Sequence, residues 1–318
     1  MKEIVITKND SGQRADKFLM KYFNKAPKSF VYKMLRKKRI KLNGGRAEGS
    51  EMLAEGDKLQ MYLAEETMEG FTEKKTVAYS KKNFDVIYED ENILAVNKPA
   101  GVLSHAESAS DKDTLIDQIL SYLSEKGEYN PDEEKSFTPA LCNRLDRNTS
   151  GIVIAGKNSE ALRQINAAVK TKSIKKLYKA LVSGTVSKGG RLEDLYSKDT
   201  DRNKASLGLG DKKIITEYRP IRSNGRYTLM EVELITGKSH QIRVHMASIN
   251  CPIIGDVKYG NDTQNNDFRK NCGVKRQLLH AYKMVLGGLS GELEYLNGKT
   301  INADIGEDFK CALDYVRL

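Results

Sequence analysis

Long apolar runs are missing from this chain: none approaches the ~20 residues of a membrane-spanning helix, and the amino terminus, "MKEIVITKND", lacks the apolar core of a signal peptide. We therefore expect a soluble, cytoplasmic protein. Paired cysteines are missing too. The four cysteines are scattered without a Cys-x-x-Cys pair, which indicates neither a zinc site nor a disulfide framework. Four reduced thiols are the expectation.

Several motifs of cofactor and nucleophile chemistry are also absent. The chain has no Gly-x-Ser-x-Gly elbow, no Cys/His signature and no glycine loop with Walker spacing. His240 and His245 lie on a predicted helix, but a spacing of five residues turns them about 140° apart. We interpret them, and His280, as structural histidines, and expect neither a metal nor a cofactor.

The positive charge of the chain is concentrated near its start. Lys and Arg outnumber Asp and Glu by 53 to 43, which indicates a polyanionic partner such as nucleic acid. Residues 1–63 alone hold fifteen Lys and Arg against seven Asp and Glu. Helical spacing of apolar residues over 12–23 and 28–40, an Asn-Gly turn at 43–44 and a strand-like run over 56–63 predict a two-helix and hairpin module.

A basic cluster falls at the end of the second predicted helix. A solvated helix face is the simple interpretation, but so many neighbouring cations repel one another unless a polyanion lies nearby. Residues 12–63 resemble the S4-type RNA-binding domain, and we predict that the cluster contacts RNA phosphates. The cluster comprises Lys33, Arg36, Lys37, Lys38 and Arg39.

The remainder of the chain predicts a second, larger domain. Residues 64–83 are polar, aperiodic and of alternating charge, which is typical of an interdomain linker. From residue 84 to 318, strand-like runs interleave with few helices and with connections of varied length. This pattern favours an α+β fold on a mostly antiparallel mixed sheet over a regular βαβ fold.

One short stretch points to chemistry. "CNRLDRNTSG", residues 142–151, places one carboxylate, Asp146, between two arginines. A neutralised polar loop would be the simple interpretation. However, "NRLDRNTSG" resembles the signature HRLDxxTSG of the RluA-type pseudouridine synthases, and further blocks match that family in order and spacing. These blocks are "NKPAGV" at 97–102, "KLYKALVSG" at 176–184, "TGKSHQIRVH" at 236–245 and "GDVKYG" at 255–260.

The resemblance implies an isomerase that converts uridine to pseudouridine with no metal and no cofactor. It implies that Asp146 is the catalytic carboxylate, attacking C1′ or removing a ribose proton, that Arg243 keeps it charged, and that Tyr178 stacks on the uracil. Arg144 would fill the gap left by a flipped base, and Arg147 would contact a phosphate or pair locally. Ser239 is predicted to cap the helix that carries Arg243.

The sequence leaves some questions open. An S4-type domain before the catalytic domain is the arrangement of the branch that acts on large-subunit ribosomal RNA, which favours 23S ribosomal RNA as substrate. Transfer RNA is the alternative substrate, and a catalytically inactive RNA-binding or ribosome-assembly protein is the alternative function. We expect a monomer. The chain departs from the family pattern at Asn143, usually His, and at Lys238, often Arg.

Overall fold

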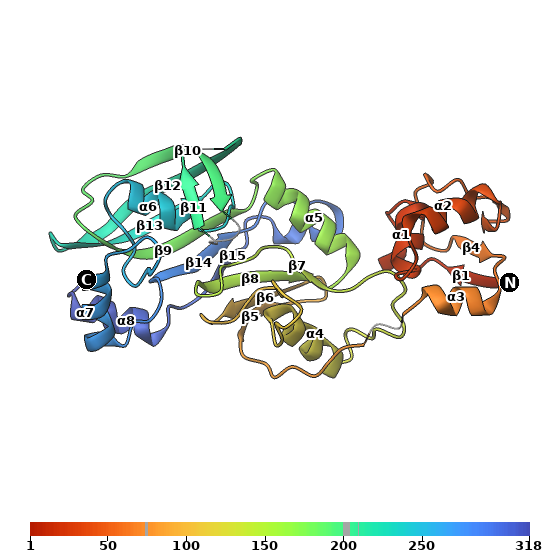
Figure 1. Cartoon of the computed structure of the whole chain (residues 1–318), viewed down its shortest axis with the longest axis horizontal. Helices are drawn as coiled ribbons and strands as arrows, with labels where there is room; N and C mark the ends of the chain where they lie inside the picture. Colours follow the sequence, from red (N-terminus) through yellow and green to blue (C-terminus); the bar gives the residue numbers. More distant parts are fainter. Residues whose placement is uncertain (74–75, 200–203, 209) are drawn as a thin grey trace. The chain divides into compact units, whose positions relative to one another are not determined.

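The computed structural model describes residues 1–73, 76–199, 204–208 and 210–318. The chain divides into two compact units (Figure 1). The first comprises residues 1–82, 117–140 and 156–163, and the second comprises 83–116, 141–155 and 164–318. Each unit is described by itself below.

The amino-terminal part of the first unit is a four-stranded sheet, in the order β1-β4-β2-β3, with two short helices. The Asn43-Gly44 turn joins β2 to β3 with both residues in the left-handed region, which a two-residue hairpin of this hand requires. The helices and hairpin therefore lie where the sequence predicts them. Their bounds are β1 Lys2–Val5, η1 Lys8–Asp10, α1 Ala15–Tyr22, α2 Lys28–Arg36, β2 Ile40–Leu42, β3 Gly45–Arg46 and β4 Lys58–Met61.

The segment 64–83, predicted to be an aperiodic linker, contains a helix, α3 (Glu65–Phe71). Met68 of this helix is buried, and Phe71 packs against the same apolar core, which includes Phe18 and Leu59. Burial of these two side chains stabilises a helix whose own sequence is polar and short. The position of the domain boundary remains our proposal, because a helix within the segment does not by itself mark where a domain ends.

The second unit is built on a large mixed sheet of mostly antiparallel pairs, and the protein thus has an α+β fold. Its strands run in the spatial order β11 (Lys204–Leu207), β10 (Gly190–Asp199), β12 (Lys212–Ser223), β13 (Tyr227–Leu234), β9 (Lys175–Ser183), β14 (Leu279–Val285), β8 (Ser150–Gly156), β6 (Ile93–Lys98) and β5 (Asp85–Glu89). Two short strands lie off this path, where β15 (Thr300–Asn302) pairs with β14 and β7 (Ala140–Leu141) pairs with β8.

The helices that lie wholly in the second unit are α6 (Gln241–Ser248), α7 (Asp262–Cys272) and α8 (Glu307–Tyr315), with a 3-10 turn, η2 (Gly291–Leu296). Helix α4 (Leu115–Glu125) belongs mostly to the first unit, and α5 (Ser159–Lys170) is divided between the two. Phe268 of α7 and Phe309 of α8 are fully buried in one apolar cluster with Leu181 of β9 and Leu229 of β13, so that this end of the sheet is covered by both helices. In the described part of the chain, no helix is long and apolar enough to cross a membrane.

The centre of the sheet brings together segments that are far apart in sequence. Strand β14 pairs with β9 in antiparallel and with β8 in parallel orientation. The approach of β8 is close, because a Cβ at Gly151 would lie 2.3 Å from the carbonyl oxygen of Ala281. Gly151 also has a φ of 120°, a value that residues with a side chain rarely adopt. The packing of β8 on β14 therefore requires glycine at the end of the signature stretch.

His280 is buried at this same junction. Its Nδ1 lies 2.8 Å from the Ser150 hydroxyl and its Nε2 lies 3.1 Å from the Ala303 carbonyl oxygen. Because a carbonyl only accepts, Nε2 carries the proton and donates, and the serine hydroxyl donates to Nδ1. Burial, aided by the charges of Arg276 and Lys179, lowers the pKa of His280 to about 4. The histidine is therefore neutral in the folded protein at neutral pH.

A His280→Gln variant tests this burial through the pH dependence of stability. The folded pKa lies below the usual value of about 6.5, so the contribution of neutral His280 is complete above pH 6.5 and is lost as pH falls toward 4. We expect the difference in free energy of unfolding between wild type and variant to shrink by on the order of 3 kcal/mol across this window. Urea unfolding at several pH values measures it, and parallel pH profiles would contradict the prediction.

Candidate active site

The signature loop, between β7 and β8, is held in place by hydrogen bonds between side chains and backbone groups. The Ser104 hydroxyl donates to the carbonyl oxygen of Leu145 at 2.9 Å and accepts from the Leu145 N–H at 3.1 Å. The amide of Asn143 spans the loop and β8: its Nδ2 donates to the Ile152 carbonyl oxygen and its Oδ1 accepts from the Ile154 N–H. Asparagine at the usual histidine position thus ties the start of the loop to the sheet.

A buried lysine from the "NKPAG" block holds the other end of the loop. Lys98 is fully buried at the end of β6, and its ammonium donates to the carbonyl oxygens of Pro99, Val102 and Arg147 at 2.9, 2.7 and 3.0 Å. Three acceptors satisfy the three donors of an ammonium group. Burial lowers the pKa of Lys98 to about 7, while the charge of Asp146 acts in the opposite direction. The side chain of Asp146 is therefore carried on a loop held at both ends.

The carboxylate of Asp146 lies beside an arginine that a second carboxylate orients. Arg243 donates from Nη1 to Asp146 Oδ2 at 3.4 Å, and from Nε and Nη2 to the two oxygens of Asp256 at 2.7 and 2.8 Å. Burial opposes the arginine charge, but Asp256 and then Asp146 hold the pKa of Arg243 above its ordinary value. The guanidinium also lies over the ring of Tyr259, 5.2 Å from its centre. Arg243 is thus fixed on three sides.

Asp256 is a site residue that the sequence motifs did not predict. It belongs to the "GDVKYG" block, and its side chain has no exposed surface. Besides Arg243, it accepts from the backbone N–H groups of Lys258 and Tyr259. The block itself was a signal, but only the fold shows that its carboxylate faces the arginine thirteen residues earlier.

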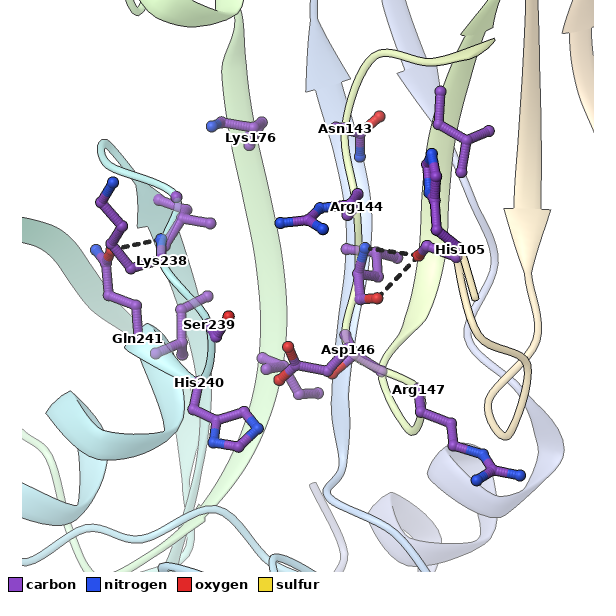
Figure 2. A pocket seen from close by; sticks show the side chains of 18 of the residues that line it. His105, Asn143, Arg144, Asp146, Arg147, Lys176, Lys238, Ser239, His240 and Gln241 are labelled. Carbon is purple, nitrogen blue, oxygen red and sulfur yellow. Dashed lines mark hydrogen bonds between the residues drawn. The ribbon is translucent and has the colours of Figure 1, made fainter. Parts of the chain in front are cut away.

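Helix α6, which carries Arg243, does not begin as predicted. Its N-cap is His240, not Ser239, and His240 has a φ of 57°, in the left-handed region. No side chain caps the first turn of α6, and the Gln241 side-chain oxygen accepts from the Lys238 N–H, before the helix, at 3.1 Å. The imidazole of His240 meets the Tyr259 hydroxyl at 3.1 Å. This tight turn presents Lys238, Ser239 and His240 along one wall in Figure 2.

Tyr178 projects from the centre of β9 toward the same opening. It is only 4% exposed, and burial together with the charge of Asp146 raises its pKa. The tyrosine is thus a neutral aromatic surface at neutral pH. Tyr178, Asp146 and Arg243 all line one cavity of about 510 Å³, so the fold brings the three predicted catalytic residues together.

The two arginines of the signature differ in their surroundings. Arg144 is exposed, lines the cavity and points into the opening in Figure 2. Arg147 lies at the rim, where its Nε donates to the Gly101 carbonyl oxygen at 3.1 Å. Its described contact is thus with the backbone and not with a carboxylate.

The basic cluster lies on the first unit and is solvent-exposed. Lys33 and Arg36 are in the last turns of α2, and the other three follow in the turn to β2, where Lys38 has a φ of 58°. The residues are Lys33, Arg36, Lys37, Lys38 and Arg39. Exposure makes these cations accessible to a polyanion, and their role in RNA binding stays a prediction.

The described residues contain no cluster of side chains that could bind a metal ion. Within the described ranges, no three His, Cys, Asp or Glu side chains are placed to hold an ion. His245 instead meets the Thr216 hydroxyl at 2.8 Å, and His240 meets Tyr259.

Known proteins match this chain over most of its length. The family model for RNA pseudouridylate synthase matches residues 92–248. An RNA pseudouridine synthase of Mycoplasma capricolum, itself uncharacterized, is 34% identical over 95% of this chain and 97% of the relative. Ribosomal large subunit pseudouridine synthase C of Rickettsia bellii is 32% identical over 89% and 93%.

A solved structure agrees in fold. Human RNA Pseudouridylate Synthase Domain Containing 4 superposes with a TM-score of 0.56, covering 73% of this chain and 93% of the human one at 22% identity. At that identity the likeness speaks for the fold only. Together with the family model and the two bacterial relatives, it leads to one conclusion: the chain belongs to the RluA-type family of RNA pseudouridine synthases, isomerases that act on RNA.

Proposed function

We propose that this protein isomerises specific uridines to pseudouridine in large-subunit ribosomal RNA, with Asp146 as the catalytic carboxylate. The observation that carries the proposal is the contact of Asp146 with Arg243 in a cavity that Tyr178 also lines. A fixed guanidinium offsets the negative charge of the carboxylate beside it, and a carboxylate is the group that the reaction requires.

The reaction breaks the bond from uracil N1 to ribose C1′ and forms one from C5 to C1′. C5 loses its proton to solvent and N1 takes up a proton, so the product is an isomer of uridine. Asp146 starts it by attacking C1′ or by removing a ribose proton, and is released unchanged at the end. Tyr178 offers its ring to the detached uracil while the base turns. Arg243 offsets the negative charge of Asp146 throughout, since Asp256 holds it in place.

The target base has to leave its stack before it reaches Asp146, at a cost of a few kcal/mol. Arg144 is suited to fill the vacated place, because its guanidinium points into the opening and can stack on bases while it binds phosphate. The exposed cations of the first unit would hold a longer stretch of structured RNA, as an S4-type domain would.

Ribosomal RNA is the proposed substrate because of the names of the relatives. The protein of Rickettsia bellii is named ribosomal large subunit pseudouridine synthase C, and a protein of Borreliella burgdorferi, 36% identical over 63% of this chain and 60% of its own length, is named ribosomal large subunit pseudouridine synthase D. The many cations of residues 1–63 also fit a large folded RNA better than a small substrate.

Pseudouridine mapping tests the proposal. Total RNA from cells with and without the gene is treated with carbodiimide and scanned for reverse-transcription stops. We expect a stop in large-subunit ribosomal RNA that disappears with the gene and returns with wild type but not with Asp146→Ala. A stop restored in transfer RNA would contradict the substrate, and an unchanged map would favour an RNA-binding or assembly protein without activity.

A further inference from the structure

Lys176 is a buried cation of the cavity for which the mechanism above has no use. It lies on β9, two residues before Tyr178, and is 8% exposed. Figure 2 shows it on the strand that faces the signature loop, and it lines the same cavity as Asp146 and Arg144. A Cβ added at Gly237 would lie 3.7 Å from its nitrogen, so the ammonium lies against the turn before α6.

The other buried cations of this unit have partners. Lys98 has three carbonyl oxygens, Arg243 has Asp256 and Asp146, and Arg276 has Asp308 at 2.7 and 2.8 Å. Among the described residues, Lys176 has no carboxylate within ion-pair distance and no hydrogen-bond acceptor. Burial alone lowers its pKa, with no neighbouring charge to offset it. The Lys176 nitrogen is not one of the buried side-chain atoms that lack a partner, so it is accessible from the cavity, where an anionic group of a ligand can pair with it.

The position of Lys176 specifies the kind of anion. Residues two apart on a strand project from the same face, about 7 Å apart along it. The ammonium is therefore displaced along β9 from the ring of Tyr178, against which the uracil is proposed to lie. In a nucleotide chain the group next to a base and its ribose is the phosphodiester. Asp146, a carboxylate of the cavity, is already engaged by Arg243.

We propose that Lys176 binds the phosphodiester next to the flipped uridine and so positions the ribose against Asp146. This inference rests on the proposed function, since it takes the uridine of an RNA strand as the substrate. The phosphate replaces the carboxylate that Lys176 lacks, and the ammonium supplies a charge-assisted hydrogen bond. RNA would then gain an anchor within the cavity that is separate from the exposed cations of the first unit.

Lys176→Met is the test variant and Lys175→Met its matched control. Both remove one lysine from β9, but Lys175 is exposed and on the opposite face of the strand. The probe is a synthetic stem–loop RNA that carries the uridine identified by mapping. We expect Lys176→Met to bind about ten- to a hundred-fold more weakly, which corresponds to one charged hydrogen bond. The slope of log affinity against log salt should fall by ~0.7, the value of one phosphate on a single strand.

RNAs with one uncharged phosphate analogue test whether Lys176 contacts a phosphate or only supports the fold. A methylphosphonate is placed on the 5′ or on the 3′ side of the target uridine. Wild type and Lys175→Met should lose affinity for one of the two RNAs, and Lys176→Met should be indifferent to both. Equal sensitivity of Lys176→Met and wild type would overturn the proposal, as would a wild type insensitive to both substitutions, even if Lys176→Met fails to fold.

The binding and turnover assays distinguish a failure of the proposed function from a failure of the proposed phosphate contact. A wild type that binds the probe with the expected salt slope but forms no pseudouridine would contradict the proposed function and leave the contact of Lys176 with phosphate standing. Conversely, full turnover with no change in slope or in methylphosphonate sensitivity on Lys176→Met would remove the phosphate contact and leave the isomerase intact.

Discussion

Asp146→Ala is expected to isomerise uridine at least about 10⁴-fold more slowly than wild type, the upper end of what one acid–base residue contributes. RNA binding should remain close to that of wild type, because the side chain removed carries no positive charge. Asp256, the other carboxylate that Arg243 contacts, is not free to take over. It is fully buried and held by both its oxygens to Arg243.

Single-turnover release of tritium from a transcript with uridine labelled at C5 measures the chemical step at saturating enzyme. Asp146→Asn is the matched control, because it keeps the size and the polar contacts of the side chain while it removes the charge. It should be as inactive as Asp146→Ala. Substantial activity in either variant would show that Asp146 is not the catalytic carboxylate.

Arg243→Met should lose both activity and stability. The substitution leaves the carboxylate of Asp256 buried without the arginine that compensates it, and removal of one member of such a pair costs about 3 to 5 kcal/mol. For a unit of this size that corresponds to a fall in melting temperature on the order of 10 °C. Isomerisation should fall as well, because Asp146 loses its only described ion-pair partner.

A double variant, Arg243→Met with Asp256→Leu, separates these two losses. Replacing both members of a buried pair by apolar side chains is often neutral for stability, so the melting temperature should recover most of its fall. Activity should not recover, since Asp146 still lacks the guanidinium. Recovery of activity in the double variant would mean that Arg243 serves only to neutralise Asp256. Thermal unfolding measures the stability of the single and double variants, and the single-turnover assay measures their activity.

The residues that sequence reasoning could find are those inside short motifs. Asp146 stands in a signature stretch, Tyr178 in a strand-like block and Arg243 at the start of a predicted helix, and all three line one cavity. The helices α1 and α2 and the Asn43-Gly44 hairpin were also accessible, because spacing of apolar residues and turn chemistry are local signals.

What escaped prediction depends on contacts over long distances in the chain. Lys98 sits in a polar block and is buried, and its third acceptor is the carbonyl oxygen of Arg147, 49 residues later. The role of Asp256 depends on Arg243 lying across a turn from it. Helix α3 forms within a polar segment because Met68 and Phe71 find an apolar core made elsewhere. None of these features leaves a periodic trace in sequence.

The place of β14 in the sheet has a consequence for synthesis of the protein on the ribosome. This strand lies between β8 and β9, yet it leaves the ribosome about a hundred residues after β9. Until residues 279–285 emerge, the strand that follows the Asp146 loop and the strand that bears Tyr178 lack the neighbour that joins them. We expect that nascent chains do not complete the cavity before β14 emerges, so a growing chain meets cellular RNA without the ability to modify it.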